Sequence, residues 1–321
     1  MIRKLFYSFM LLMVSAVAEA TNEPAISTYT YAEKGGQALC LDVCVDTTVH
    51  VQGKRPVLVF SFGGGWETGK RQDGDDLIRW FAHRGYVGVS IDYRLYIHQL
   101  KTSGKKLNIF NVATSYYSAI LTGVEDLYDA TSYIIGKADT WNADTSRIAI
   151  CGSSAGAINS VMAEYLISND NPLALSHLPR GFNYAALIPC AGGIWQQGDG
   201  EPTWKHKPCA CLLYHGTSDQ MVPYKVFRPT PPDFGAYGPA FYVDQLKAMH
   251  VPYLMHSFSG VDHAIAGIYN RADIRDEMFN FLQRVMIGGE HIATTIVEED
   301  YDRKPDTKTF EDTIREMISK N

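Results

Sequence analysis

Short apolar runs alternate with longer stretches of helical periodicity along most of the chain. The runs are bounded by charge or glycine, which is typical of strands buried on both faces. They cover 56–62, 86–92, 148–151, 185–189, 209–215 and 251–258. Apolar residues recur at helical spacing over 75–83, 117–135 and 158–166. This alternation predicts one α/β domain with a doubly wound, mostly parallel sheet and helices on both faces.

The N-terminal region adds strands of another kind. Residues 27–31 and 40–45 predict two antiparallel strands, joined by a turn over 34–36 that contains two glycines. Together with the buried runs they bring the expected sheet to about eight strands. The run 251–258 is expected to be the last of them.

Two polar stretches and one glycine interrupt the pattern. Residues 98–108 carry three lysines around a glycine and predict a surface excursion that could form one wall of a cleft. Residues 227–240 contain four prolines and predict a loop. Gly123 is a candidate break in the long helix.

The run 148–151 leads into the sequence Gly152-Ser153-Ser154-Ala155-Gly156. A Gly-x-Ser-x-Gly motif alone is weak, because chance produces it in about one chain in ten of this length. Here a strand precedes it and an amphipathic helix follows, and this context makes the motif specific. Small residues beside the apex permit a sharp strand-to-helix turn that exposes the Ser154 hydroxyl. The pattern predicts the nucleophile elbow of a serine hydrolase.

A serine nucleophile needs a histidine to take its proton and an acid to orient that histidine. Asp219 follows the run 209–215, and His263 follows the run 251–258, so both lie after strands and in the order expected for such a site. Asp262 is the weaker candidate acid, because its side chain should point away from its neighbour. His215 is expected to cap its strand structurally.

Three consecutive glycines, Gly63, Gly64 and Gly65, follow the run 56–62. A flexible turn is the alternative explanation. However, ligands bind at the carboxyl ends of parallel strands, where glycines let the backbone approach a ligand and direct amides at it. The triplet therefore favours a functional role.

Composition excludes some classes of function. The chain has 321 residues, 46% of them hydrophobic, and a net charge of −6 with dispersed lysines and arginines, which argues against nucleic-acid binding. Six cysteines are expected to be mostly buried free thiols. No cysteine–histidine spacing predicts a zinc site, and no metal or cofactor is expected.

Residues 1–20 have the pattern of a signal peptide. Arg3 and Lys4 form a basic start, 5–17 is nearly continuously apolar, and Ala18-Glu19-Ala20 is a small-x-small cleavage site. The apolar run is shorter than the roughly 20 residues of a spanning helix, so no stable membrane anchor is expected. The sequence predicts an exported protein, periplasmic or secreted, whose oligomeric state is open.

Taken in order, these motifs resemble the α/β-hydrolase superfamily, in particular its carboxylesterase and feruloyl-esterase-like branch close to hormone-sensitive lipases. The matching segments are FGGGW at 62–66, DYRL at 92–95, CGSSAG at 151–156, HGTSDQMVP at 215–223 and DHA at 262–264, with Asp144 and Arg147 before the elbow. The resemblance implies Ser154 as nucleophile, Asp219 as acid and His263 as base. It also implies an oxyanion hole made by the amides of Gly64, Gly65 and Ala155. The chain departs from the family at Phe62, where a histidine usually orients the glycine loop.

The signal pattern and the resemblance together divide the chain into a signal peptide at 1–20, a hydrolase domain at 21–287 and a C-terminal extension at 288–321. The extension is expected to dock on the same domain through a short helix. The apolar residues of that helix are Phe310, Ile314, Met317 and Ile318.

The predicted function is hydrolysis of carboxylic esters of short-acyl or aryl (feruloyl) type, with a small-molecule or carbohydrate-linked substrate. Trp66, Tyr93, Trp195 and Met221 follow strand ends and are expected to surround Ser154. A serine exopeptidase is the alternative, with Glu67 as the residue that would bind a peptide amine. A non-catalytic binder on the same scaffold is a third possibility.

Overall fold

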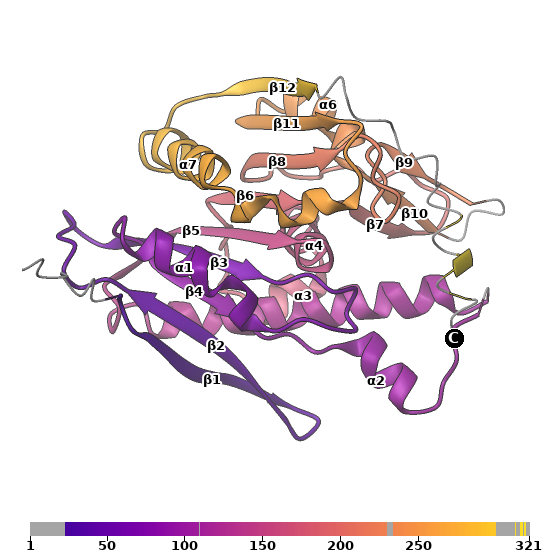
Figure 1. Ribbon diagram of the computed structural model, residues 1–321, viewed down its shortest axis with the longest axis horizontal. Helices are drawn as coiled ribbons and strands as arrows, with labels where there is room; N and C mark the ends of the chain where they lie inside the picture. The colour runs from indigo at the N-terminus through magenta and orange to yellow at the C-terminus, as the bar shows by residue number, and fades with distance from the viewer. Residues whose placement is uncertain are drawn as a thin grey trace, which may run out of the picture.

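A nine-stranded mixed sheet organises the molecule (Figure 1). The computed structural model describes residues 23–108, 110–229 and 234–299, with 312, 315, 316 and 318. The strand order is β1-β2-β4-β3-β5-β6-β8-β11-β12. Its strands are β1 (Ile26–Lys34), β2 (Gln37–Val45), β3 (Arg55–Ser61), β4 (Val87–Ile91), β5 (Ala143–Ser153), β6 (Ala186–Cys190), β8 (Ala210–Gly216), β11 (Tyr253–Ser259) and β12 (Ala293–Glu299).

The sheet is mostly parallel, as predicted. β2 pairs antiparallel with β1 and β4, whereas the other neighbours are parallel. Every residue of β4, β6 and β8 is buried, which explains their continuous apolar sequences. Gly35 and Gly36 adopt φ 58° and 81° in the β1–β2 turn, a conformation in which glycine is unstrained.

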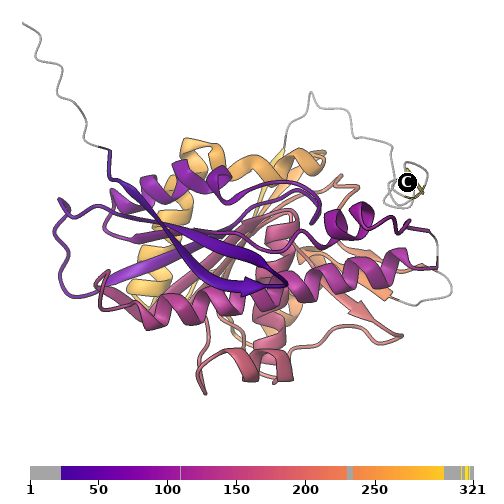
Figure 2. The ribbon, with the colours of Figure 1, turned by 90° about the horizontal axis from the view of Figure 1, so that it is seen from below.

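Helices cover both faces of the sheet (Figure 2). They are α1 (Asp75–Ala82), α2 (Tyr96–Thr102), α3 (Val112–Gly136), α4 (Ala155–Ser168), α5 (Pro172–His177), α6 (Pro239–Ala248) and α7 (Ala272–Phe281). Helix α4 packs on β5 and β6, and α3 packs on α4. In the described part of the chain, no helix has both the length and the apolar character needed to cross a membrane.

Helix α3 is continuous through Gly123, so the candidate break is wrong. The glycine serves a close approach instead. A Cβ at position 123 would lie 2.5 Å from Asn159 Nδ2, so glycine lets α3 pack tightly on α4.

Two polar stretches contain more regular structure than predicted. The excursion at 98–108 begins within α2. The run 227–240 was predicted as loop, but it overlaps β9 (Val226–Phe227) and contains β10 (Phe234–Tyr237) before α6 starts at Pro239. β10 pairs with β9 and with β7 (Ile194–Gln197) in a separate three-stranded sheet.

β11, which corresponds to the run 251–258, is not the last strand. β12 pairs parallel with it over seven residues, so the main sheet continues past residue 287. All seven residues of β12 are exposed, and therefore this strand lacks the apolar run that marks the inner strands. The predicted signal peptide at 1–20 lies outside the described residues, as do Phe310, Ile314 and Met317 of the predicted terminal helix.

Candidate active site

Ser154 occupies the turn between β5 and α4 with φ 50° and ψ −117°, an uncommon conformation for a residue with a side chain. Its amide donates to the Cys190 carbonyl (2.9 Å), and its carbonyl accepts the Ile158 amide in the first turn of α4 (2.9 Å). These bonds fix the backbone on both sides of the serine. The side chain is left at the carboxyl edge of the sheet, where Ser154 lines a cleft.

The glycines of the elbow are required by close backbone contacts. A Cβ on Gly152 would lie 2.4 Å from the carbonyl carbon of Gly156, and one on Gly156 would lie 2.1 Å from the Ser61 carbonyl oxygen. The turn therefore closes on itself and packs against the end of β3. Only residues without a side chain fit at these two positions.

The structure brings Ser154, His263 and Asp219 together in one hydrogen-bonded chain. Ser154 Oγ lies 2.8 Å from His263 Nε2, and His263 Nδ1 lies 2.8 Å and 3.0 Å from the two carboxylate oxygens of Asp219. The Asp219 side chain is fully buried, whereas the His263 side chain is 19% exposed. This is the geometry of a nucleophile, a base and an orienting acid.

Several hydrogen bonds join the two loops that carry the acid and the histidine. The Ser218 amide donates to the Val261 carbonyl (3.0 Å), and the Gly260 amide donates to Thr217 Oγ1 (2.9 Å). Gly216 ends β8 against the second loop, since a Cβ there would lie 2.2 Å from the Val261 oxygen. The ends of β8 and β11 are thus tied together just before the two functional side chains.

Asp219 is held as a carboxylate. Burial alone would raise its pKa, but the hydrogen bond and charge of His263, with smaller contributions from His215 and the Val222 amide, lower the pKa below the usual value. Oδ1 also accepts the amides of Met221 (2.8 Å) and Val222 (2.9 Å). The acid therefore has a fixed orientation and a stable negative charge.

His215 lies beneath this site and is fully buried. Its Nε2 lies 3.0 Å from the Val222 carbonyl, and burial lowers its pKa below the usual value, although the charge of Asp219 acts in the opposite direction. Asp262, the other candidate acid, accepts the Ala264 amide (3.0 Å) and caps the 3₁₀ helix at His263–Asn270. Asp262 therefore forms a local cap, whereas Asp219 contacts the histidine ring.

The glycine triplet runs beside Ser154. A Cβ on Gly63 would lie 3.3 Å from Ser154 Cβ. The carbonyl of Gly64 accepts the amides of Glu67 and Thr68 (3.0 Å each), which turns that oxygen into the loop. In a trans peptide the next amide points the opposite way, so the Gly65 N–H is directed away from the turn.

The Gly63 carbonyl oxygen fixes the direction of the Gly64 amide. This oxygen faces Gly69, because a Cβ on Gly69 would lie only 2.4 Å from it. The Gly64 N–H therefore points away from Gly69. Ala155 is the first residue of α4, where amides have no carbonyl partner within the helix. Gly64 and Gly65 line the cleft, and Ala155 directly follows Ser154, so the three amides remain the candidates for an oxyanion hole.

Phe62 stands where the family that the sequence resembles usually has a histidine, and it is held in place by packing. Its ring is buried and stacks on Tyr93 at 4.3 Å with an interplanar angle of 18°. The Tyr93 hydroxyl donates to the Phe62 carbonyl (2.8 Å), and the ring also contacts Gly69. The strand end before the glycines is thus held by an aromatic pair and one hydrogen bond.

The cleft at Ser154 has a volume of about 520 Å³, and it differs from the predicted aromatic pocket. Of the predicted substrate-binding residues, Glu67 and Met221 line it. Trp66, Tyr93 and Trp195 are only 2%, 2% and 6% exposed and do not, so that part of the prediction is wrong.

Each of these three rings turns into the core. Trp66 Nε1 donates to Asn159 Oδ1 (3.0 Å), Tyr93 packs on Phe62, and Trp195 stacks on Phe234 at 5.9 Å. Trp66 also has φ 57°, a backbone conformation uncommon for a residue with a side chain. A position after a strand end therefore did not determine the direction of the side chain.

Three cleft residues were not singled out from the sequence: Thr68, Tyr116 and Ala266. Lys101 belongs to the polar stretch that was expected to form one wall, and that signal pointed to it. It donates to Glu67 Oε2 at 2.8 Å across the rim. Tyr116 comes from α3, and the helical pattern around it did not indicate that it lines the cleft. The lining is consequently more polar than predicted.

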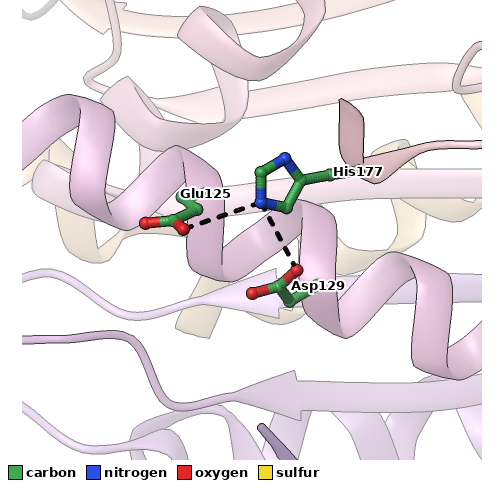
Figure 3. A group of neighbouring side chains, drawn as sticks. All are labelled: Glu125, Asp129 and His177. Atoms are coloured by element: carbon green, nitrogen blue, oxygen red, sulfur yellow. Dashed lines mark ion pairs between the residues drawn. The ribbon is translucent and has the colours of Figure 1, made fainter. Parts of the chain in front are cut away.

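One side-chain cluster away from the cleft could in principle ligate a cation. Glu125, Asp129 and His177 point toward one another, with His177 Nε2 3.6 Å and 3.7 Å from the two carboxylates (Figure 3). However, the Lys34 ammonium lies 3.0 Å from Glu125 and 2.7 Å from Asp129. Lys34 already supplies a cation to both carboxylates. The six cysteines have free thiols, five of them buried.

Comparisons with known proteins show the fold. No family model matches the chain, and no curated protein matches it by sequence. Solved structures of an esterase from the Planctomycetes species Thermogutta terrifontis are similar. Its apo form has 20% identity and a TM-score of 0.59, with 85% of this chain and 97% of that chain covered.

The same coverage is found for its propionate-bound form (17%, TM-score 0.57) and for the form phosphonylated by cyclosarin (18%, TM-score 0.58). These alignments extend over nearly the whole of that protein and most of this one. Together with the mostly parallel nine-stranded sheet and the turn at Ser154, they show that this chain has the α/β-hydrolase fold.

Proposed function

We propose that this protein is a serine hydrolase that cleaves short-acyl carboxylic esters. The observation that carries the proposal is the continuous chain Ser154 Oγ–His263–Asp219, located in a cleft beside three glycines. The similar Thermogutta esterase has been crystallised with propionate and with butyrate, which supports a short acyl group. The aryl alternative relied on aromatic walls, and Trp66, Tyr93 and Trp195 do not supply them.

In the first half of the reaction, Ser154 Oγ attacks the ester carbonyl carbon while His263 Nε2 takes the hydroxyl proton. The negative oxygen of the tetrahedral intermediate is bound by the amides of Gly64, Gly65 and Ala155. The intermediate collapses, the alcohol departs with the proton from His263, and an acyl-Ser154 remains.

In the second half, His263 takes a proton from water, and the resulting hydroxide attacks the acyl carbonyl. The same amides bind the second oxyanion. Collapse releases the carboxylic acid and returns the proton to Ser154. Asp219 remains ionised throughout and holds the imidazole through Nδ1.

A serine exopeptidase remains the second candidate, because Glu67 does line the cleft. Its carboxylate is already paired with Lys101 at 2.8 Å, so a peptide amine would have to displace that lysine. Because Lys101 competes with a peptide amine for Glu67, the esterase function is favoured over the peptidase function.

The deciding experiment compares p-nitrophenyl acetate or butyrate with an aminoacyl p-nitroanilide on the purified protein. We expect clear turnover of the esters and little of the anilide. Efficient anilide cleavage that collapses in Glu67→Gln would establish the peptidase instead. No turnover of either class would contradict hydrolase activity.

A further inference from the structure

The ion pair at the rim of the cleft has no role in the chemistry proposed for Ser154. Lys101 lies near the end of α2, and Glu67 follows the glycine triplet. The two side chains are 30% and 40% exposed, so each can reach a molecule that occupies the cleft. Both are among the residues that line it.

The backbone holds the two elements of this pair in register. The carbonyl of Trp66, one residue before Glu67, accepts the amides of Ile97 (3.1 Å) and His98 (3.2 Å) in α2. The pair is therefore built onto fixed backbone, and it does not connect two independent surface side chains. Its polar groups are pre-positioned for a ligand.

The chemistry of the pair selects against charged ligands. Lysine offers only donors and an ionised glutamate only acceptors, and their charges cancel at 2.8 Å. A free carboxylate or a free ammonium would have to break the pair. Adjacent hydroxyls fit it, because each hydroxyl can donate to Glu67 and accept from Lys101 at the same time.

Other lining residues support a hydroxyl-rich ligand. Tyr116 supplies an aromatic side chain near the pair, packed edge-on against Trp66 at 5.9 Å. Such a ring can cover the apolar face of a saturated ring. Thr68 adds a hydroxyl to the lining of the same cleft.

On the basis of the proposed esterase function, we infer that the alcohol part of the substrate is a neutral, polyhydroxylated ring of the sugar type. Lys101 and Glu67 bind its hydroxyls at the rim, where the departing alcohol meets solvent. The acyl group lies deeper, at Ser154. The pair is thus the specificity determinant of the cleft.

The test compares two acetate esters of similar shape, methyl 6-O-acetylglucopyranoside and cyclohexylmethyl acetate. The second has the ring without hydroxyls. The quantity measured is the ratio of their kcat/KM values, which we expect to exceed about ten for the wild type, since hydrogen bonds to charged groups each contribute about one to two powers of ten.

Glu67→Gln and Lys101→Met should each lower this ratio about ten-fold or more, mainly through a higher KM for the sugar ester. Lys105→Met is the matched control, because Lys105 lies on the same polar stretch but does not line the cleft, and it should leave the ratio unchanged. Thermal melting of each variant confirms that it is folded.

A wild-type ratio near one, or variants that keep the wild-type ratio, would overturn the inference. p-Nitrophenyl acetate separates this failure from failure of the proposed function. Turnover of that ester without a sugar preference refutes only the role of the ion pair. Absence of all ester turnover refutes the esterase and this inference with it.

Discussion

Ser154, the proposed nucleophile, has a strained backbone. A side chain at φ 50° and ψ −117° costs on the order of 1–3 kcal/mol. The surrounding structure offsets this cost through the bond to Cys190 and the packing of Gly152 and Gly156. Such strain is characteristic of functional sites, where it exposes a side chain that an unstrained turn would bury.

The first prediction concerns Asp219. Asp219→Asn should lower kcat about 10⁴-fold near neutral pH, because an amide would hold His263 in the wrong tautomer for accepting the serine proton. Since the folded protein lowers the pKa of this carboxyl, Asp219 stays ionised from neutral pH down past its usual range. Steady-state kinetics with a chromogenic ester measures the loss.

The matched control is Asp262→Asn, next to the histidine. Asparagine is an equally good helix cap, so the 3₁₀ helix that begins at His263 should be retained. We expect a loss of less than about ten-fold. Equal losses in the two variants would mean that Asp219 is not the specific partner of the histidine.

For single residues, local motifs predicted where a residue lies in the fold better than they predicted where its side chain points. Ser154, Asp219 and His263 each follow a strand, and the ends of parallel strands meet at one edge, so their proximity followed from the sequence. The same reasoning failed for Trp66 and Trp195. Both rings are buried, and Trp66 has a positive φ, neither of which shows in the sequence.

The glycine loop is the element that the chemistry requires to be rigid. It is held by the stacking of Phe62 on Tyr93, where a histidine would be expected from the resemblance. Phe62→Ala should lower kcat on the order of 10²-fold with a smaller effect on KM, because misplaced amides lose transition-state stabilisation. Michaelis–Menten kinetics separates these two effects.

Two further variants separate the loss of the stacked ring from a loss of folding, since removing a buried phenylalanine lowers the free energy of unfolding by about 3–5 kcal/mol. Phe62→Leu keeps most of the volume without the stacked ring. Tyr93→Phe keeps the ring but removes the hydrogen bond to the Phe62 carbonyl. If Phe62→Ala remains folded and keeps the wild-type kcat, the loop does not depend on this packing.

Inner strands and amphipathic helices could be predicted because burial imposes an apolar pattern on them. β12 could not, since its seven exposed residues include threonines and glutamates and are held by main-chain pairing with β11. β10 was hidden for another reason: its four residues are buried, but the strand is short and lies in a stretch rich in proline. Where pairing alone stabilises a strand, its sequence lacks a diagnostic pattern.

At the scale of the whole molecule, β12 completes the sheet beside the strand that leads to His263. A chain ending at residue 290 should unfold at a temperature about 5–10 °C lower than one ending at Glu299, because β11 loses a paired neighbour over seven residues. Differential scanning calorimetry gives both midpoints. The difference isolates the strand from whatever follows residue 299, and identical midpoints would show that β12 adds no stability.

The site draws on strands from across the sheet. β3 supplies the glycine loop, β5 the serine, β8 the acid and β11 the histidine, so the chain of hydrogen bonds forms only in the folded molecule. The central claim is that this assembly makes Ser154 a nucleophile.

The most direct measurement is covalent labelling of the native protein with a fluorophosphonate probe, followed by peptide mass spectrometry. We expect one adduct on Ser154, absent from Ser154→Ala and from urea-unfolded protein but present in Ser153→Ala. An adduct on another residue, or equal labelling of the wild type and Ser154→Ala, would contradict it.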